Sequence, residues 1–180
     1  MNLFLHDIDD AYIERGDTLR DPKHLTDDKA IRTFDRVIAN PPFSLANWGQ
    51  DVWSAGDSFG RDKYGCPPKS YGDLAFVQHM VASLSSKGKL GVVLPHGILF
   101  RGGAEAKIRK GLLEDDLIEG VVGLASNLFY GTGIPACVLI INKNKPKARK
   151  GKVCFVHGAE HFVEGKNQNS LSEENVNLDF

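Results

Sequence analysis

Four consecutive residues, Asn40-Pro41-Pro42-Phe43, combine side-chain types that suit a transfer reaction on a nitrogen atom. A short apolar run, Val37-Ile38-Ala39, precedes them and predicts a buried strand. The two prolines end this strand because proline has no N–H to donate to a sheet ladder. The asparagine is therefore expected at the carboxyl end of a strand, which is the edge where open α/β sheets bind ligands.

The chemistry that this motif suits is methyl transfer to an exocyclic amine or an amide nitrogen. The lone pair of such a nitrogen is delocalised, and two acceptors facing its N–H groups would free the pair for attack. The Asn40 side-chain carbonyl and the Pro41 main-chain carbonyl are candidate acceptors, and the rings of Pro41 and Pro42 fix their direction. Phe43 offers a face for stacking a planar base. A strand-ending turn with a buried phenylalanine fits the same four residues equally well.

The composition fits one globular domain with a hydrophobic core, because 42% of the 180 residues are hydrophobic and 25% are charged. The three cysteines, Cys66, Cys137 and Cys154, include no C-x-x-C pair, so we expect reduced thiols and a cytoplasmic protein. The first residues turn acidic too early for a signal peptide, and no apolar run is long enough to cross a membrane. We therefore expect no membrane partner.

The net charge of −1 does not by itself indicate a nucleic-acid-binding protein. Six basic residues nevertheless lie close together in the sequence: Lys143, Lys145, Lys147, Arg149, Lys150 and Lys152. Such a cluster can follow the phosphates of a nucleic acid. The presence of Pro146 and the lack of an apolar period favour a solvated loop instead.

Hydrophobic periodicity predicts alternating strands and helices after the candidate site. The expected elements are a helix at 73–87 capped by Asp73, a strand at 90–94 stopped by Pro95, a helix opened by Arg101-Gly102-Gly103, and strands at 120–124, 136–141 and 152–156. Gly88 is expected to end the first helix. Residues 12–14 predict a weak strand before the candidate site, and the residues from Gly165 predict a loose polar tail.

The length of the last connection predicts a mixed sheet. A parallel return needs a crossover of a dozen or more residues, usually with a helix. Residues 125–135 show no helical pattern, so the strand at 136–141 should run antiparallel to its neighbour. The strand at 152–156 is expected at an edge of the sheet.

Residues 44–72 show neither a helical nor a strand period. They carry five glycines and five aromatic side chains, the latter being Trp48, Trp53, Phe59, Tyr64 and Tyr71. Structureless segments of this length are usually functional or disordered, and aromatic residues argue against disorder. We interpret the segment as a mobile lid or substrate-facing loop directly after the candidate site, and the alternative is a loop packed by its own aromatic side chains.

Three further features are candidate ligand sites. Asp17 follows the weak strand, where its carboxylate could accept from a ribose hydroxyl or an adenine amine, but an aspartate in a turn fits the same pattern. Gly131-Thr132-Gly133 precedes a strand, whereas a nucleotide-binding glycine loop follows one, so we reject it as a cofactor site. His157 and His161 lack a nearby thiolate pair, and we expect no metal site.

Several segments together resemble the modification subunit of type I restriction-modification systems, a family of adenine-N6 DNA methyltransferases. They are Asn40-Pro41-Pro42-Phe43-Ser44, the run Leu-Pro-His-Gly-Ile-Leu-Phe-Arg-Gly-Gly at 94–103, Asn127-Leu128-Phe129-Tyr130-Gly131-Thr132, Ile134-Pro135-Ala136-Cys137 and Gly165-Lys166-Asn167-Gln168-Asn169. The resemblance runs nearly end to end. It implies the C-terminal portion of a class I S-adenosylmethionine-dependent methyltransferase fold, Rossmann-like, with one antiparallel strand in a mixed sheet.

The resemblance also implies roles for the residues of the candidate site. Asn40-Pro41-Pro42-Phe43 would be the catalytic motif, in which Asn40 and Pro41 bind the amine of the target adenine and Phe43 stacks on the base. Phe129 or Tyr130 would pack the base from its other side.

For the cofactor, S-adenosylmethionine, the resemblance implies contacts from Asp17 to the adenine, with Leu19 and Asn40 also in its site. The family's glycine loop and its acidic ribose contact have no counterpart in these 180 residues, and residues 1–6 resemble an internal helix of the family. Residues 1–165 are therefore expected to form part of a catalytic domain, followed by a polar tail at 166–180. We expect this chain alone to be inactive.

The implied function is transfer of a methyl group to the N6 amine of adenine in DNA. The implied partners are double-stranded DNA with a flipped adenine, a specificity subunit that reads the sequence, and a restriction subunit. Two alternatives stay open, a non-catalytic remnant that assembles or binds DNA, and a protein-glutamine N-methyltransferase, because the same two acceptors suit an amide. The Pro-His-Gly and Phe-Arg-Gly-Gly segments favour the restriction family over the second alternative.

Overall fold

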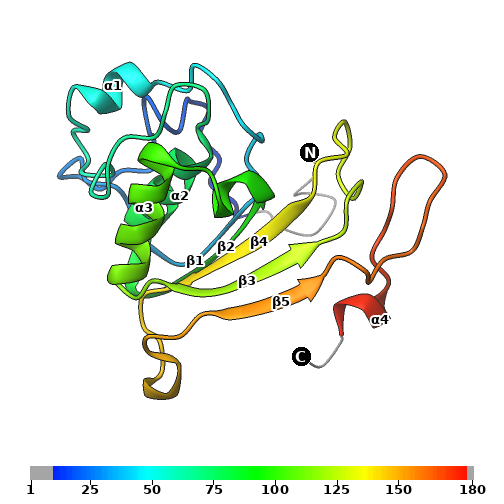
Figure 1. Cartoon of the computed structure of the whole chain (residues 1–180). Coiled ribbons are helices and arrows are strands. Elements are labelled where there is room, and N and C mark those ends of the chain that lie inside the picture. Colours follow the sequence, from blue (N-terminus) through cyan, green and yellow to red (C-terminus); the bar gives the residue numbers. More distant parts are fainter. Residues whose placement is uncertain (1–9, 178–180) are drawn as a thin grey trace.

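A five-stranded sheet in the order β1-β2-β4-β3-β5 organises the chain (Figure 1). The strands are β1 (Phe34–Ala39), β2 (Leu84–Pro95), β3 (Ile118–Leu124), β4 (Ala136–Asn142) and β5 (Cys154–Gly158). This computed structural model describes residues 10–177, so the helix expected within residues 1–6 lies outside the described residues. Strands β1 and β2 are parallel, as are β3 and β5, whereas β4 is antiparallel to both β2 and β3. The mixed sheet, the antiparallel strand and the edge position of β5 are confirmed.

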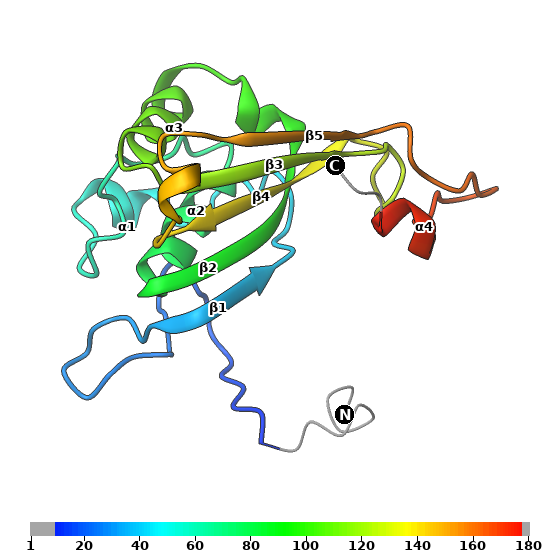
Figure 2. The same ribbon diagram turned by 90° about the horizontal axis from the view of Figure 1, so that it is seen from below.

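Two helices, α2 (Asp73–Ala82) and α3 (Gly103–Glu114), lie on one side of the sheet (Figures 1 and 2). The remaining helical elements are short: α1 (Gln50–Ser54), the 3-10 turns η2 (His96–Leu99) and η3 (Lys147–Arg149), and α4 (Glu173–Val176). The opening of α3 directly after Arg101-Gly102 is as expected.

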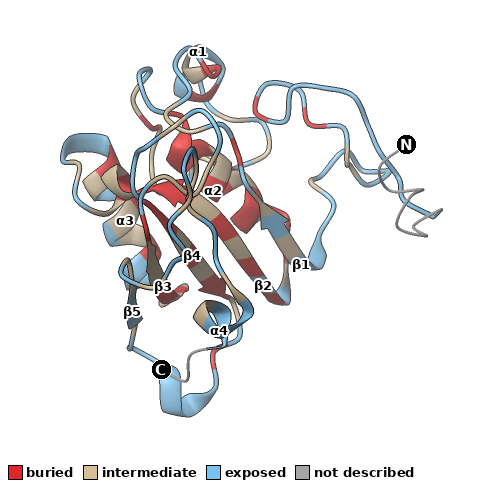
Figure 3. Cartoon of the chain, turned by 90° about the vertical axis from the view of Figure 1, so that its right-hand side faces the viewer, coloured by how far each residue is buried: buried red, intermediate tan, exposed pale blue. Residues whose placement is uncertain are grey.

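The register of the sheet decides which side chains enter the core. Leu90, Val92 and Leu94 of β2 pair with Ile141, Leu139 and Cys137 of β4, and all six are buried under α2 and α3. Successive side chains of a strand point to opposite faces, so the alternate residues lie on the face that neither α2 nor α3 covers. Figure 3 shows the result, with buried residues concentrated in β2 and β4 and exposed ones in β1.

Strand β1 lies at an edge of the sheet, which corrects the expectation of a buried strand. Its residues are exposed or half-buried, and Ile38 is 86% exposed. An apolar run of three residues cannot distinguish a central from an edge strand, since only the neighbouring strands decide it. Residues 12–14, expected to be a weak strand, form no regular element, and Tyr12 and Ile13 are exposed.

Helix α2 is shorter than expected, because β2 begins at Leu84. Gly72 precedes the helix, Asp73 is its first residue, and Ser83 ends it with main-chain and hydroxyl hydrogen bonds to His79 O. Gly88 does not end a helix but lies within β2, where the pairing with β1 slips. A Cβ at Gly88 would lie 3.0 Å from the main-chain oxygen of Phe34, so the close approach of β1 and β2 at this position favours glycine.

Residues 44–72 form a second small core beside the sheet. Trp48 and Trp53 are buried against Leu19 and Ala75, and the two indoles meet edge to face with centroids 5.3 Å apart. This packing corrects the interpretation as a mobile lid and supports the alternative, a loop packed by its own aromatic side chains. Aromatic residues without a regular period do not predict a helix or a strand, yet their side chains supply enough apolar surface to order the segment.

The tail from Gly165 is not loose. Val163 pairs with Ser170, and Gln168 and Asn169 donate hydrogen bonds to main-chain oxygens of residues 126–128. Helix α4 follows and begins at a capping box formed by Ser172 and Asn175. The boundary at 165/166 between catalytic domain and tail stays a prediction.

Candidate active site

The carboxyl end of β1 and the connection between β3 and β4 meet in one cleft. Asn40, Pro41, Pro42 and Phe43 line it on one side, and Phe129, Tyr130 and Thr132 line it on the other. Its volume of about 350 Å³ lies within the range of small-molecule sites, roughly 300–1,000 Å³. The structure thus brings together the motif and both aromatic residues that the sequence singled out.

Two aromatic rings at the wall of this cleft are in contact with each other. The rings of Phe43 and Phe129 meet edge to face, with centroids 5.8 Å apart and an interplanar angle of 68°. Pro41 is buried and anchors the motif, whereas Asn40 is exposed and Tyr130 is 93% exposed. The cleft therefore offers carbonyl acceptors beside aromatic surfaces, which suits a planar heterocycle with an amino group.

A buried aspartate holds the chain directly after the motif. Ser44 adopts a left-handed conformation with φ 51°, and its N–H donates to Asp73 Oδ1 at 2.8 Å. The other carboxylate oxygen of Asp73 accepts from Arg101 Nη1 at 3.1 Å. Asp73 therefore fixes the direction in which the chain leaves Phe43. The sequence indicated this residue only as a helix cap, since no local pattern shows a partner so far away.

Arg101 joins three segments at the same edge of the sheet. Besides Asp73, its guanidinium donates to Glu105 Oε1 at 3.2 Å and lies 4.0 Å from the ring centre of Tyr71. Burial raises the pKa of Glu105, although Arg101 opposes the shift. Gly97 leaves the room that the guanidinium occupies, because a Cβ there would collide with it. Sequence reasoning placed Arg101 at a helix start and missed this role.

Asp17 lies in a turn outside the cleft of Asn40–Phe43. Its Oδ1 accepts from the N–H groups of Leu19 and Arg20, both at 3.0 Å, while Oδ2 lies 3.8 Å from Arg20 Nε. The side chain stays half-exposed, and Oδ2 has only the long ion pair with Arg20, so it can accept a further donor such as an adenine amine. The roles of Asp17, Leu19 and Asn40 toward a cofactor stay predictions.

Leu19 supports the Asp17 turn from inside the second core. Its side chain is 1% exposed, and its main-chain oxygen accepts from Trp53 Nε1 at 3.1 Å and from Arg61 Nη2 at 2.8 Å. The side chain therefore packs in the protein interior. Any contact of Leu19 with a ligand would come from main-chain atoms.

Arg61 is the centre of this support and was not recognised in the sequence. It forms a fully buried ion pair with Asp57 at 2.6 Å and donates to Thr18 O at 3.0 Å. Its Nη1 lies 3.3 Å from Nδ1 of His79, which must accept, because arginine only donates. Burial, together with the nearby Arg61 charge, lowers the pKa of His79 to about 4.

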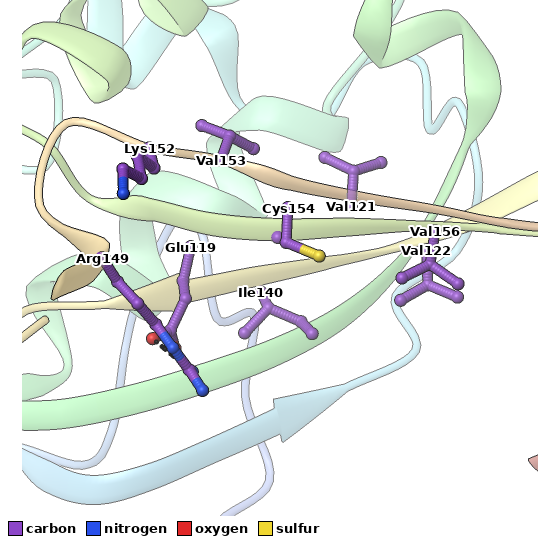
Figure 4. Close-up of a pocket in the computed structure, with 10 residues that line it drawn as sticks. Glu119, Val121, Val122, Ile140, Arg149, Lys152, Val153, Cys154 and Val156 are labelled. Atoms are coloured by element: carbon purple, nitrogen blue, oxygen red, sulfur yellow. Dashed lines mark hydrogen bonds and ion pairs between the residues drawn. The ribbon is translucent and has the colours of Figure 1, made fainter. Parts of the chain in front are cut away.

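A larger hollow of about 470 Å³ lies away from this cleft, between β3, β4 and β5 (Figure 4). Its lining is mainly apolar, and two of its three charged residues pair with each other, Arg149 Nη1 donating to Glu119 Oε1 at 3.2 Å. Lys152 and the thiol of Cys154 also line it, but they do not form a constellation with a defined chemistry. This hollow is not a candidate active site.

The basic cluster and Asn40 lie at opposite ends of the strands. The cluster follows the carboxyl end of β4, which runs antiparallel to β2, whereas Asn40 follows the carboxyl end of β1, which runs parallel to β2. Lys145 is buried and donates to Asp116 at 2.6 Å, and Lys143 donates to Leu84 O at 2.7 Å. Internal partners thus occupy part of the cluster, which fits the loop interpretation. Among residues 10–177, no group of three metal-ligating side chains occurs, and no helix is long and apolar enough to cross a membrane.

Comparison with known proteins gives the family. The model of N-6 DNA methylases matches residues 1–178 of the chain. The chain belongs to the N-6 DNA methylase family. The methylase subunit of the type I restriction enzyme MjaVIII from Methanocaldococcus jannaschii is 39% identical over 98% of this chain. The match confirms the resemblance to type I modification subunits, and the chain spans about a third of that relative's length (32%).

Solved structures agree with this assignment and confirm the fold class. The type I restriction-modification methyltransferase subunit from Streptococcus thermophilus is 36% identical, with a TM-score of 0.85 over 97% of this chain and 36% of its own. A putative class I S-adenosylmethionine-dependent methyltransferase from Listeria monocytogenes, 18% identical, shares the fold with a TM-score of 0.50 over 70% of this chain and 38% of its own.

Proposed function

We propose that this chain binds the target adenine in an adenine-N6 DNA methyltransferase, the modification subunit of a type I restriction-modification system. The observation that supports this most strongly is the cleft in which Asn40 and Pro41 lie beside Phe43 and Phe129. Asn40 provides a side-chain carbonyl and Pro41 a main-chain carbonyl. These are two acceptors for the two N–H groups of one amine.

The chain's own residues then bind, orient and activate the base. An adenine taken out of the duplex stacks on Phe43, where stacking is worth roughly 1–3 kcal/mol. The Phe129 ring must leave its edge-to-face contact with Phe43 to cover the other face of the base. Its amine donates to the Asn40 and Pro41 carbonyls, which direct the nitrogen lone pair away from them. As the nitrogen gains positive charge during transfer, the two carbonyl dipoles stabilise it without reorientation, and the nitrogen then loses one of its two amine protons to water.

S-adenosylmethionine supplies the methyl group when bound. The residues present fit its adenine end, where the half-exposed Oδ2 of Asp17 can accept the adenine amine. They do not include a glycine loop after a strand, so the methionine end requires sequence outside these 180 residues. We therefore propose that residues 1–165 form one part of a catalytic domain and that the chain alone is inactive.

The proposed partners are double-stranded DNA, a specificity subunit and a restriction subunit. The relatives are methylase subunits of type I restriction enzymes, whose names imply further subunits. We propose that sequence recognition belongs to the specificity subunit. A cytoplasmic location follows from this role. The family match argues against a protein-glutamine methyltransferase and, together with the intact Asn40-Phe43 motif, against a non-catalytic remnant.

The test is methyl transfer by the full-length gene product with its specificity subunit. We expect labelled methyl groups from S-adenosylmethionine to appear in duplex DNA as N6-methyladenine on digestion and mass spectrometry. Label in glutamine of a peptide substrate, or methylation of cytosine, would contradict the proposal.

A further inference from the structure

The tail motif Gly165-Lys166-Asn167-Gln168-Asn169 holds the segment that leads to Phe129. The main-chain oxygens of three consecutive residues receive its hydrogen bonds. Asn169 Nδ2 donates to Ser126 O at 3.1 Å, Asn169 N donates to Asn127 O at 2.8 Å, and Gln168 Nε2 donates to Leu128 O at 2.7 Å. Phe129 is the next residue along the chain.

Residues 125–132 have little regular structure and few internal hydrogen bonds. Residues 125–128 form neither helix nor strand, and Asn127 adopts a left-handed conformation with φ 59°. Within residues 126–132 the turn is closed by a long hydrogen bond, from Thr132 N to Phe129 O at 3.4 Å. The hydrogen bonds from the tail therefore hold the main chain that places the Phe129 ring against Phe43.

The conformation of residues 163–170 directs Gln168 and Asn169 toward residues 126–128. The Val163–Ser170 pairing turns it back on itself, and Gly165 N donates to Asn169 Oδ1 at 3.3 Å, which orients the Asn169 amide so that Nδ2 faces Ser126. Gly165 faces the main-chain oxygen of Gln168 so closely that a Cβ would collide with it. Glycine at this position therefore keeps Gln168 and Asn169 turned toward the loop.

We propose that Gln168 and Asn169 are positioning residues for target-base binding, acting through the main chain of residues 126–128 on Phe129. This inference rests on the proposed function for its consequence, although the clamp itself is a structural claim. Loss of the clamp would let the Phe129–Tyr130 turn move away from Phe43. Binding of the flipped base would weaken, and binding of S-adenosylmethionine would not change, because none of the clamp's hydrogen bonds involves Asp17, Leu19 or Asn40.

The decisive variant is Gln168→Glu, compared with Asn167→Asp in the full-length gene product. Both add one negative charge to the same turn. Only Gln168→Glu removes the donor to Leu128 O, since Asn167 is exposed and has no hydrogen bond within the described residues. We expect KM for DNA to rise about tenfold or more in Gln168→Glu, because the loss of this hydrogen bond leaves the acceptor Leu128 O unpaired. In Asn167→Asp we expect little change in KM.

A fluorescent adenine analogue, 2-aminopurine, at the target position reports directly on the flipped base. We expect the change in its fluorescence on protein binding to be smaller in Gln168→Glu than in the parent protein, and to equal that of the parent in Asn167→Asp. The affinity for S-adenosylmethionine should be unchanged in both variants. Equal behaviour of the two variants in KM and fluorescence would overturn the proposal. Gly165→Ala, which disturbs the turn sterically, should reproduce the Gln168→Glu effect.

Amide hydrogen exchange separates the clamp from the function. In Gln168→Glu, residues 127–132 should exchange faster than in Asn167→Asp, while β2 and β4 exchange as in the parent. If exchange does not change, the clamp is wrong even when methylation proceeds as proposed. If exchange accelerates but Asn40→Ala still methylates DNA, the proposed function is wrong and the clamp stands.

Discussion

At the scale of single residues, Phe43 is the side chain whose size and shape should matter most for base binding. We expect Phe43→Ala to lower kcat/KM for DNA about 5- to 150-fold, the equivalent of roughly 1–3 kcal/mol of lost stacking. Phe43→Tyr and Phe43→Trp keep an aromatic face and should retain part of the activity. Equal activity of the alanine and tryptophan variants in steady-state assays would show that Phe43 only fills space.

His79 should make stability depend on pH. Its pKa is about 4 in the folded protein, against an ordinary value of 6.5, so the unfolded chain binds a proton more readily. The free energy of unfolding should therefore fall as pH drops from about 6.5 to about 4, with no contribution above that window. Urea titrations across this range test it, and His79→Gln should reduce the slope. An unchanged slope in the variant would contradict the assignment.

The candidate motif could be found from the sequence, whereas the contacts that hold it in place could not. The proposed role of Asn40-Pro41-Pro42-Phe43 rests on local chemistry, because two prolines after an apolar run restrict the backbone wherever the strand lies. Asp73, Arg101 and Arg61 act through partners far away in the sequence and through burial. A single sequence contains no signal for such contacts.

At the scale of elements, the segment 44–72 acts as a brace between the Asp17 turn and the sheet. We expect Trp53→Ala to destabilise the protein by about 3–5 kcal/mol, because it opens a cavity in the second core and removes the donor to Leu19. Val52→Ala, in the same helix but exposed, should change stability by less than about 0.5 kcal/mol. Chemical denaturation measures both, and similar values for the two variants would mean that the segment is loosely attached.

Element boundaries were the least predictable part of the fold. The apolar stripe of α2 continues into Leu84, so its spacing suggested a helix beyond Ala82. Pairing with Phe34 makes Leu84 the first residue of β2 instead. The antiparallel direction of β4 was predictable, because a short connection without a helix permits no parallel return.

At the scale of the whole molecule, the described residues supply the proposed base-binding cleft and, through Asp17, one end of the proposed cofactor site. We expect the 180-residue chain to bind S-adenosylmethionine with a dissociation constant above about 1 mM, because it lacks several hydrogen bonds to a charged ligand, at about 1.5–3 kcal/mol each. Isothermal titration calorimetry is the test. A low micromolar constant would mean that no glycine loop is needed.

The central claim is that Asn40 binds the amine that receives the methyl group. The most direct measurement is the rate of N6-methyladenine formation by the full-length gene product carrying Asn40→Ala, with its fold checked by circular dichroism. Loss of a preorganised acceptor predicts a fall in kcat of about 100-fold or more, with DNA still bound. A rate near that of the parent protein would contradict the account.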